Sequence, residues 1–122
     1  MIKSCMEDLS VGVDILEIER VKRVINRFGE RFLSRVFTEK ERETIPEKNT
    51  LLYYALGFSF KESVWKALPE KIQESTYFKD IEIYWRKNHP SLQIKNLSFP
   101  YSLSFSVNKE FVVTIAILRI TQ

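Results

Sequence analysis

Glu62 and Lys66 are the residues of this sequence whose types and spacing best suit chemistry, because they are four positions apart. On a helix, residues i and i+4 lie on one face, so a carboxylate and an ammonium can converge on a common target. The same spacing is also common for a surface ion pair worth about 0.2–0.5 kcal/mol, and on residue types alone this interpretation comes first. The pair therefore marks a candidate site but assigns it no reaction.

The surrounding residues 51–69 predict one long amphipathic helix as the central element of the chain. Asn49 and Thr50 can cap its start, and Pro69 ends it because proline has no N–H to donate. Apolar residues recur every four positions along one stripe: Leu52, Leu56, Phe60, Val64 and Leu68. A glycine inside a helix costs about 1 kcal/mol relative to alanine. Small residues are nevertheless frequent here and indicate that backbone or ligand comes close: Ala55, Gly57, Ser59 and Ser63.

Residues 11–16, VGVDIL, alternate in the manner of a short strand. Aspartate is depleted in strands, so Asp14 either faces solvent on an edge strand or has a function, and the spacing alone favours the edge. After the strand, apolar residues at helical spacing predict a helix over 18–28 with its basic residues outward, closed by Gly29.

The rest of the chain predicts an α+β fold, an antiparallel sheet packed against one long helix. Thr38-Glu39-Lys40-Glu41 has the form of a capping box and predicts a short helix, while the polar residues after Pro69 predict a loop with at most a helical turn. Four strands are expected over 80–85, 91–97, 101–107 and 111–120, the last two joined as a hairpin through 108–110.

Length and composition favour a single domain over residues 1–122, preceded by a tail over 1–9, with 44% hydrophobic residues to fill one core. The single Cys5 can form neither an internal disulfide nor a thiolate zinc cage, which suits a reducing compartment. The single His89, beside a proline in a turn, is expected to be exposed, which argues against histidine-dependent triads and most zinc chemistry. The chain has neither an apolar signal core nor a membrane-length apolar run, so a cytoplasmic protein is expected.

The net charge of +3 is modest, but positive residues cluster between Arg20 and Arg35, where Glu30 is the only acid. The bland interpretation is a solvated helix face. The functional alternatives are an acidic protein partner and nucleic acid, because clustered cations attract anionic ligands. Glu17 and Glu19 flank the cluster and no nucleic-acid motif accompanies it, so nucleic acid ranks last.

Taken together, VGVDILEIERV, RFLSRVFTEKE, FSFKESVWKAL, DIEI and SLSFSVNKEF resemble the holo-acyl-carrier-protein synthases of the 4'-phosphopantetheinyl transferase superfamily. The resemblance runs over roughly residues 11 to 119 in the family's order. It implies transfer of 4'-phosphopantetheine from coenzyme A to a serine of an apo acyl carrier protein, with release of adenosine 3',5'-bisphosphate.

By the same resemblance, Asp14 and Glu62 would hold Mg²⁺ on the coenzyme A pyrophosphate. Magnesium prefers oxygen ligands and usually takes one or two carboxylates plus phosphates and water, which suits these residue types. Lys66 would face the charge that develops on the pyrophosphate, and Lys61 would meet a coenzyme A phosphate. Two candidates stay open for the base that deprotonates the carrier serine: a water oriented by Glu62, or Lys66 itself.

The resemblance also gives the basic segment a partner, since acyl carrier proteins are acidic. Arg20 matches the docking arginine of the family, and Arg27 is the expected second contact. Related single-domain synthases are homotrimers with active sites between subunits, so a homotrimer is expected, in which Asp14 and Glu62 need not come from one chain.

Three positions depart from the family pattern. Gly57 stands where an arginine is frequent, Pro69-Glu70 replaces a glycine-rich loop, and Phe105 replaces a histidine of the hairpin. All three fall on the expected coenzyme A side. The alternative function is therefore a non-catalytic or degenerate family member that binds an acidic carrier protein.

Overall fold

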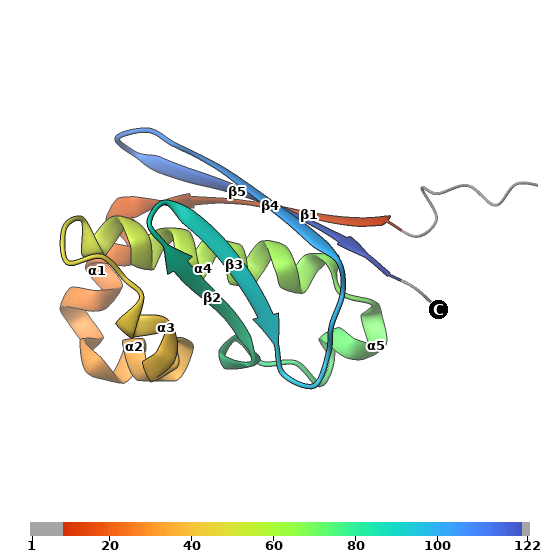
Figure 1. Ribbon diagram of the computed structural model, residues 1–122. Coiled ribbons are helices and arrows are strands. Elements are labelled where there is room, and N and C mark those ends of the chain that lie inside the picture. Colours follow the sequence, from red (N-terminus) through yellow and green to blue (C-terminus); the bar gives the residue numbers. More distant parts are fainter. Residues whose placement is uncertain (1–8, 121–122) are drawn as a thin grey trace, which may run out of the picture.

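The computed structural model describes residues 9–120. Along the chain the elements are β1 (Leu9–Glu17), α1 (Ile18–Phe28), α2 (Glu30–Val36), α3 (Glu39–Glu43), α4 (Thr50–Ala67), α5 (Glu70–Gln73), the 3₁₀ turn η2 (Phe78–Asp80), β2 (Ile81–Arg86), β3 (His89–Ile94), β4 (Tyr101–Val107) and β5 (Phe111–Arg119). Helix α4 runs through the middle, with a three-stranded sheet along one side and the β2–β3 hairpin along another (Figure 1).

The larger sheet has the order β1-β5-β4, and both strand pairs are antiparallel. It packs on α4 so closely that a Cβ added to Gly12 would lie 1.7 Å from the backbone oxygen of Ser63. Only glycine fits at this crossing. The predicted close approach of backbone to the small residues of α4 is thus found at Ser63, where β1 crosses the helix.

The second sheet is the hairpin of β2 and β3, joined by Lys87 and Asn88. Its inward residues Ile83 and Trp85 join the main core, where Trp85 lies edge-on to Tyr53 and packs near Phe60 of α4. Because helix α4 is covered by both sheets, it is buried on all but one strip of its surface, so the predicted one-sided amphipathic helix is wrong.

Helices α1, α2 and α3 gather at one end of α4 (Figure 1), over a smaller core built on Leu33, Val36 and Phe37. The ring of Phe37 explains Gly57, because a Cβ there would lie 3.0 Å from a carbon of this ring. The group that approaches Gly57 is therefore an aromatic side chain.

The predicted α+β class with antiparallel strands packed on a long helix is confirmed. So are the capping box at Thr38, the β4–β5 hairpin, Gly29 as the cap of α1, and an exposed His89.

Several boundaries differ from the prediction. Asn49 occupies the cap position of α4 in a left-handed conformation, with φ of 65°, and its side chain makes no capping bond. The turn before β3 is shorter than expected, because β3 already begins at His89. The loop after Pro69 contains α5 and η2. At the N-terminus, β1 begins at Leu9, the last residue of the predicted tail; the other residues of that tail, Cys5 among them, lie outside the described residues.

Strand β1 is an edge strand, as predicted, but its two faces are the reverse of the expected arrangement. Gly12, Asp14 and Leu16 turn toward the helices, while Val11, Val13 and Ile15 are each more than half exposed. Val13 pairs with Ile115 of β5, so the apolar surface continues onto the neighbouring strand. Large exposed apolar patches mark interaction sites.

Within residues 9–120, no helix combines the length and the apolar character needed to cross a membrane.

Candidate active site

Three of the predicted site residues meet where β1 passes α4: Asp14, Glu62 and Lys66. The Lys66 ammonium reaches β1, where it donates to the backbone oxygen of Val13 at 3.1 Å and to Asp14 Oδ1 at 3.4 Å. It pairs with Asp14 across the two elements, so the expected surface ion pair along the helix is not what positions it. All three side chains meet within one chain.

Glu62 lies on the one strip of α4 that neither sheet covers, and it is half-buried. Burial raises the pKa of the Glu62 carboxyl, the nearby Asp14 carboxylate raises it further, and Lys66 partly opposes both effects. A carboxyl group whose ionisation is disfavoured by a neighbouring carboxylate forms with that neighbour a site that gains from a bound cation.

Asp14 and Glu62 open into a cavity of about 320 Å³ between β1, α1, α2 and α4. The remaining lining residues are Ile15, Leu16, Arg20, Val21, Val24, Phe32 and Phe58. The hollow thus combines three charged side chains with six apolar ones, a mixture that suits the binding of a small molecule.

Arg20 lies in the first turns of α1 and lines this cavity beside the two carboxylates. Arg27, in the last turn of α1, lies over the ring of Phe28 with its guanidinium carbon 5.3 Å from the ring centroid. The two arginines are seven positions apart in the sequence, so they occupy the same face of α1 about 10 Å apart. Both are exposed and available to a partner.

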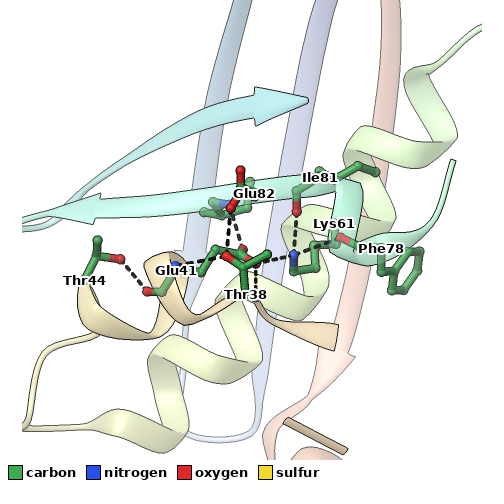
Figure 2. Close-up of polar contacts among 8 residues, drawn as sticks. Thr38, Glu41, Thr44, Lys61, Phe78, Ile81 and Glu82 are labelled. Atoms are coloured by element: carbon green, nitrogen blue, oxygen red, sulfur yellow. Dashed lines mark hydrogen bonds and ion pairs between the residues drawn. The ribbon is translucent and has the colours of Figure 1, made fainter. Parts of the chain in front are cut away.

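Lys61 does not join the cavity, although it precedes Glu62 in the chain. Its side chain is 0% exposed, and its Nζ donates to Glu41 Oε1 at 2.8 Å, to the backbone oxygen of Phe78 at 2.9 Å and to that of Ile81. Figure 2 shows this Nζ between α3, η2 and β2. An ammonium has three protons, so in this arrangement none remains for a coenzyme A phosphate.

Glu41 is the buried acidic partner of Lys61. Its Oε1 also accepts from the backbone N–H of Thr38 at 3.0 Å, and its Oε2 accepts from that of Ile83 at 2.8 Å (Figure 2). Burial raises the pKa of Glu41 and lowers the pKa of Lys61, and their mutual attraction opposes both shifts. The pair ties α3, α4 and β2 together, a role that the capping-box pattern did not indicate.

The three departures from the family pattern all have structural explanations. Gly57 faces the Phe37 ring, and Pro69 precedes α5, whose Gln73 side chain donates to the backbone oxygen of Trp65 at 2.8 Å. Phe105 turns inward against Phe60 and Trp85 and supplies no polar group.

The side chains at this site suit one kind of divalent cation binding. Within residues 9–120 no cluster of three or more histidine, cysteine or acidic side chains could enclose a metal. Two carboxylates, one of them with a raised pKa, suit Mg²⁺, which completes its coordination with water and substrate phosphates. The residues present therefore fit magnesium bound together with a phosphate substrate, and they do not fit a metal caged by protein alone.

Ser59 is a neighbour of the site that the sequence analysis noted only for its small size. Its hydroxyl donates to Asp14 Oδ2 at 2.7 Å from inside the protein. The spacing offers a signal, because Ser59 precedes Glu62 by three residues and therefore lies on an adjacent part of the helix surface.

Comparison with protein families matches residues 10–116 to the 4'-phosphopantetheinyl transferase superfamily. The chain belongs to this superfamily. The resemblance of its motifs to that family is thereby confirmed, over nearly the same residues.

Individual relatives agree with this assignment. A holo-[acyl-carrier-protein] synthase of Chlamydia muridarum is 32% identical over 122 residues, covering 91% of this chain and 94% of that protein. Another, of Maridesulfovibrio salexigens, is 41% identical over 75 residues, covering 62% of this chain and 60% of that protein. Among solved structures, a holo-(acyl-carrier-protein) synthase of Bacillus anthracis in complex with CoA (3',5'-ADP) is similar, with a TM-score of 0.76 and 28% identity over 92% of this chain and 96% of that one.

Proposed function

We propose that this protein transfers 4'-phosphopantetheine from coenzyme A to a serine of an apo acyl carrier protein and releases adenosine 3',5'-bisphosphate. The observation that carries the proposal is the meeting of Asp14 and Glu62 at one cavity, with Lys66 beside Asp14, in a chain of this superfamily. The similar proteins named as holo-acyl-carrier-protein synthases, one of them solved with coenzyme A, support the choice of substrates.

In this reaction the serine oxygen attacks the phosphorus that bears the pantetheine, and the bond from this phosphorus to the bridging pyrophosphate oxygen breaks. The serine proton must leave, and negative charge develops on the departing bisphosphate. Asp14 and Glu62 are the residues that would hold Mg²⁺, which when bound supplies positive charge to the pyrophosphate oxygens. The exposed Lys66 ammonium stands next to Asp14 and adds positive charge on the same side.

Glu62 is better placed than Lys66 for removing the serine proton. Burial and the nearby Asp14 raise its pKa, and it opens into the cavity, so it can orient a water that takes the proton. Lys66 as the base remains the alternative. Lys61 is left out of the coenzyme A contacts because its three donors are engaged inside the protein.

The carrier protein would approach along α1, whose Arg20 and Arg27 present positive charge on one face. Arg20 also borders the cavity that holds Asp14 and Glu62, so a partner bound on this face lies next to the site of transfer. Charge complementarity of this kind raises the association rate more than the final affinity.

We further propose that three copies assemble through the apolar face of the β1-β5-β4 sheet. Val11, Val13 and Ile15 leave this face exposed in one copy, and the family resemblance implies a trimer. Light scattering should give three times the chain mass of 14.5 kDa. A mass of one chain at micromolar concentration would contradict this assembly.

The transfer itself is tested by incubating the protein with an apo acyl carrier protein, coenzyme A and Mg²⁺, followed by intact-mass measurement. The carrier should gain one phosphopantetheine group, and chelation of the metal should prevent the gain. The alternative, a non-catalytic module that binds carrier protein, is favoured by Phe105, which gives the expected nucleotide side an aromatic ring in place of a polar group. Carrier binding without any gain of mass would support that alternative.

A further inference from the structure

The Asp14 carboxylate is fixed by hydrogen bonds to both of its oxygens. Oδ1 faces Lys66 at 3.4 Å, a long contact to an ammonium that is 46% exposed. Oδ2 accepts from Ser59 Oγ at 2.7 Å, a short contact typical of a hydroxyl bonded to an ionised carboxylate. The strong and permanent partner of Asp14 is therefore a serine of α4.

Ser59 is built into the protein interior for this contact. Its side chain is 0% exposed, and its hydroxyl also lies 2.8 Å from the hydroxyl of Thr114, which is buried as well. Thr114 is the register partner of Asp14 on β5, so both side chains stand on the face of the sheet that turns toward α4. The three groups form a chain from the buried Thr114 through Ser59 to Asp14.

Counting protons fixes the donor of the bond to Asp14. An ionised carboxylate can only accept, so the single proton of Ser59 goes to Asp14. Thr114 has a single proton for two hydroxyl neighbours, Ser59 and Ser63, so it can donate to only one of them, and the bond from Ser59 to Asp14 does not depend on which. Water has no access to these hydroxyls, so no solvent molecule can replace the bond if it is lost.

We propose that Ser59 is a positioning residue that holds the Asp14 carboxylate in the orientation required for binding Mg²⁺ with coenzyme A. One oxygen of Asp14 is anchored from inside, and the carboxylate is held beside Glu62 at the cavity. Outer partners of metal-binding carboxylates typically contribute 10- to 100-fold to metal affinity. The inference rests on the proposed function, since it assigns Asp14 to the metal.

The chain contains a matched control in Ser63, four residues further along α4. Ser63 is also 0% exposed, and its Oγ lies 3.1 Å from the Thr114 hydroxyl, but its other bond goes to the backbone oxygen of Phe60 at 3.2 Å. Ser59→Ala and Ser63→Ala therefore remove the same group from the same helix and the same hydroxyl cluster. Only the first removes a bond to Asp14.

The test measures Mn²⁺ binding, with Mn²⁺ as a probe for Mg²⁺, in the presence of saturating coenzyme A. Free Mn²⁺ is followed by electron paramagnetic resonance. Ser59→Ala should weaken binding about tenfold or more, Ser63→Ala should match wild type, and Ser59→Cys, which keeps a weak donor, should fall in between. In the transfer assay, Ser59→Ala should need more Mg²⁺ for half-maximal rate while its rate at saturating Mg²⁺ stays close to that of wild type.

Each outcome separates the inference from the proposed function. Equal Mn²⁺ affinity in wild type and Ser59→Ala would overturn the role of Ser59 and leave the transferase intact. Equal weakening in both alanine variants would overturn it too, because the effect would then come from packing. If wild type transferred phosphopantetheine but bound no Mn²⁺, the metal assignment and the role of Ser59 would both fall. If Ser59→Ala failed to fold, Ser59→Cys would decide alone, and wild-type Mn²⁺ affinity in that variant would reject the proposal.

Discussion

Replacing Lys61 by methionine distinguishes a structural lysine from a coenzyme A contact. Methionine keeps most of the length of the side chain but has neither the charge nor the three donors. In Lys61→Met the Glu41 carboxylate would keep its bonds from the backbone N–H groups of Thr38 and Ile83, but it would lose the ammonium at 2.8 Å. Two backbone oxygens, those of Phe78 and Ile81, would also lose a donor inside the protein.

The expected cost follows from the burial of the pair, whose side chains are 0% and 1% exposed. Removing one partner of a buried ion pair typically costs about 3–5 kcal/mol, because the other charge is left uncompensated. Small domains are stable by only about 5–15 kcal/mol, so Lys61→Met should lose about a fifth or more of the free energy of unfolding. With a urea dependence of about 1–3 kcal/mol per molar, the unfolding midpoint should fall by at least about 1 M.

The assay is urea unfolding at one fixed protein concentration, so that any subunit association affects all variants alike. Glu41→Gln should lower the free energy of unfolding by a similar amount. The N–H groups of its amide would face a backbone N–H or the lysine ammonium, which are also donors. The double variant should lose less free energy of unfolding than the two single variants lose together, since each single change leaves the other group unpaired.

Lys66→Met is the matched control, because Lys66 lies on the same helix but its side chain is 46% exposed. It should keep the wild-type unfolding midpoint and lose transfer activity. Folded Lys61→Met should in turn keep the wild-type KM for coenzyme A. An unchanged unfolding midpoint together with a raised KM for coenzyme A in Lys61→Met would refute the buried arrangement and restore Lys61 as a phosphate contact.

The remaining predictions concern the site, the docking face and the crossing of β1 over α4. Asp14→Ala and Glu62→Ala should each abolish Mg²⁺-dependent transfer with a fold retained by circular dichroism; an unchanged transfer rate in either would refute its metal role. Reversing Arg20 and Arg27 to glutamate should raise the KM for carrier protein and leave the KM for coenzyme A nearly constant. The difference in carrier KM between the variant and wild type should shrink as salt shortens the Debye length from about 10 Å at 0.1 M to about 3 Å at 1 M. Equal carrier KM values across the salt series would remove this face from the mechanism. Gly12→Ala should destabilise by more than the about 1–3 kcal/mol usual for overpacking, because its Cβ would lie 1.7 Å from a backbone oxygen, and a wild-type melting temperature would contradict that crossing.

The sequence determined the elements whose causes are local. Helical periodicity and the Thr38 capping box depend on neighbours within a few residues, and the structure confirms the corresponding helices. The β4–β5 hairpin is of the same kind, because the side chain of Asn108 closes its turn by accepting from the backbone N–H groups of Glu110 and Phe111. Motif order then identified the family, and with it the types of residue expected at the site.

The tertiary structure alone decided which neighbours each polar residue has. Lys61 and Glu62 are adjacent in the chain, but the helix turns by about 100° per residue, so one points at α3 and β2 and the other into the cavity. The spacing within β1 placed Asp14 at a solvent edge, whereas packing against α4 turned it to Ser59 and Lys66. A strand pattern defines two faces but not which of them meets the helix; here a glycine at position 12 allows the close crossing, and that contact determines which way Asp14 points.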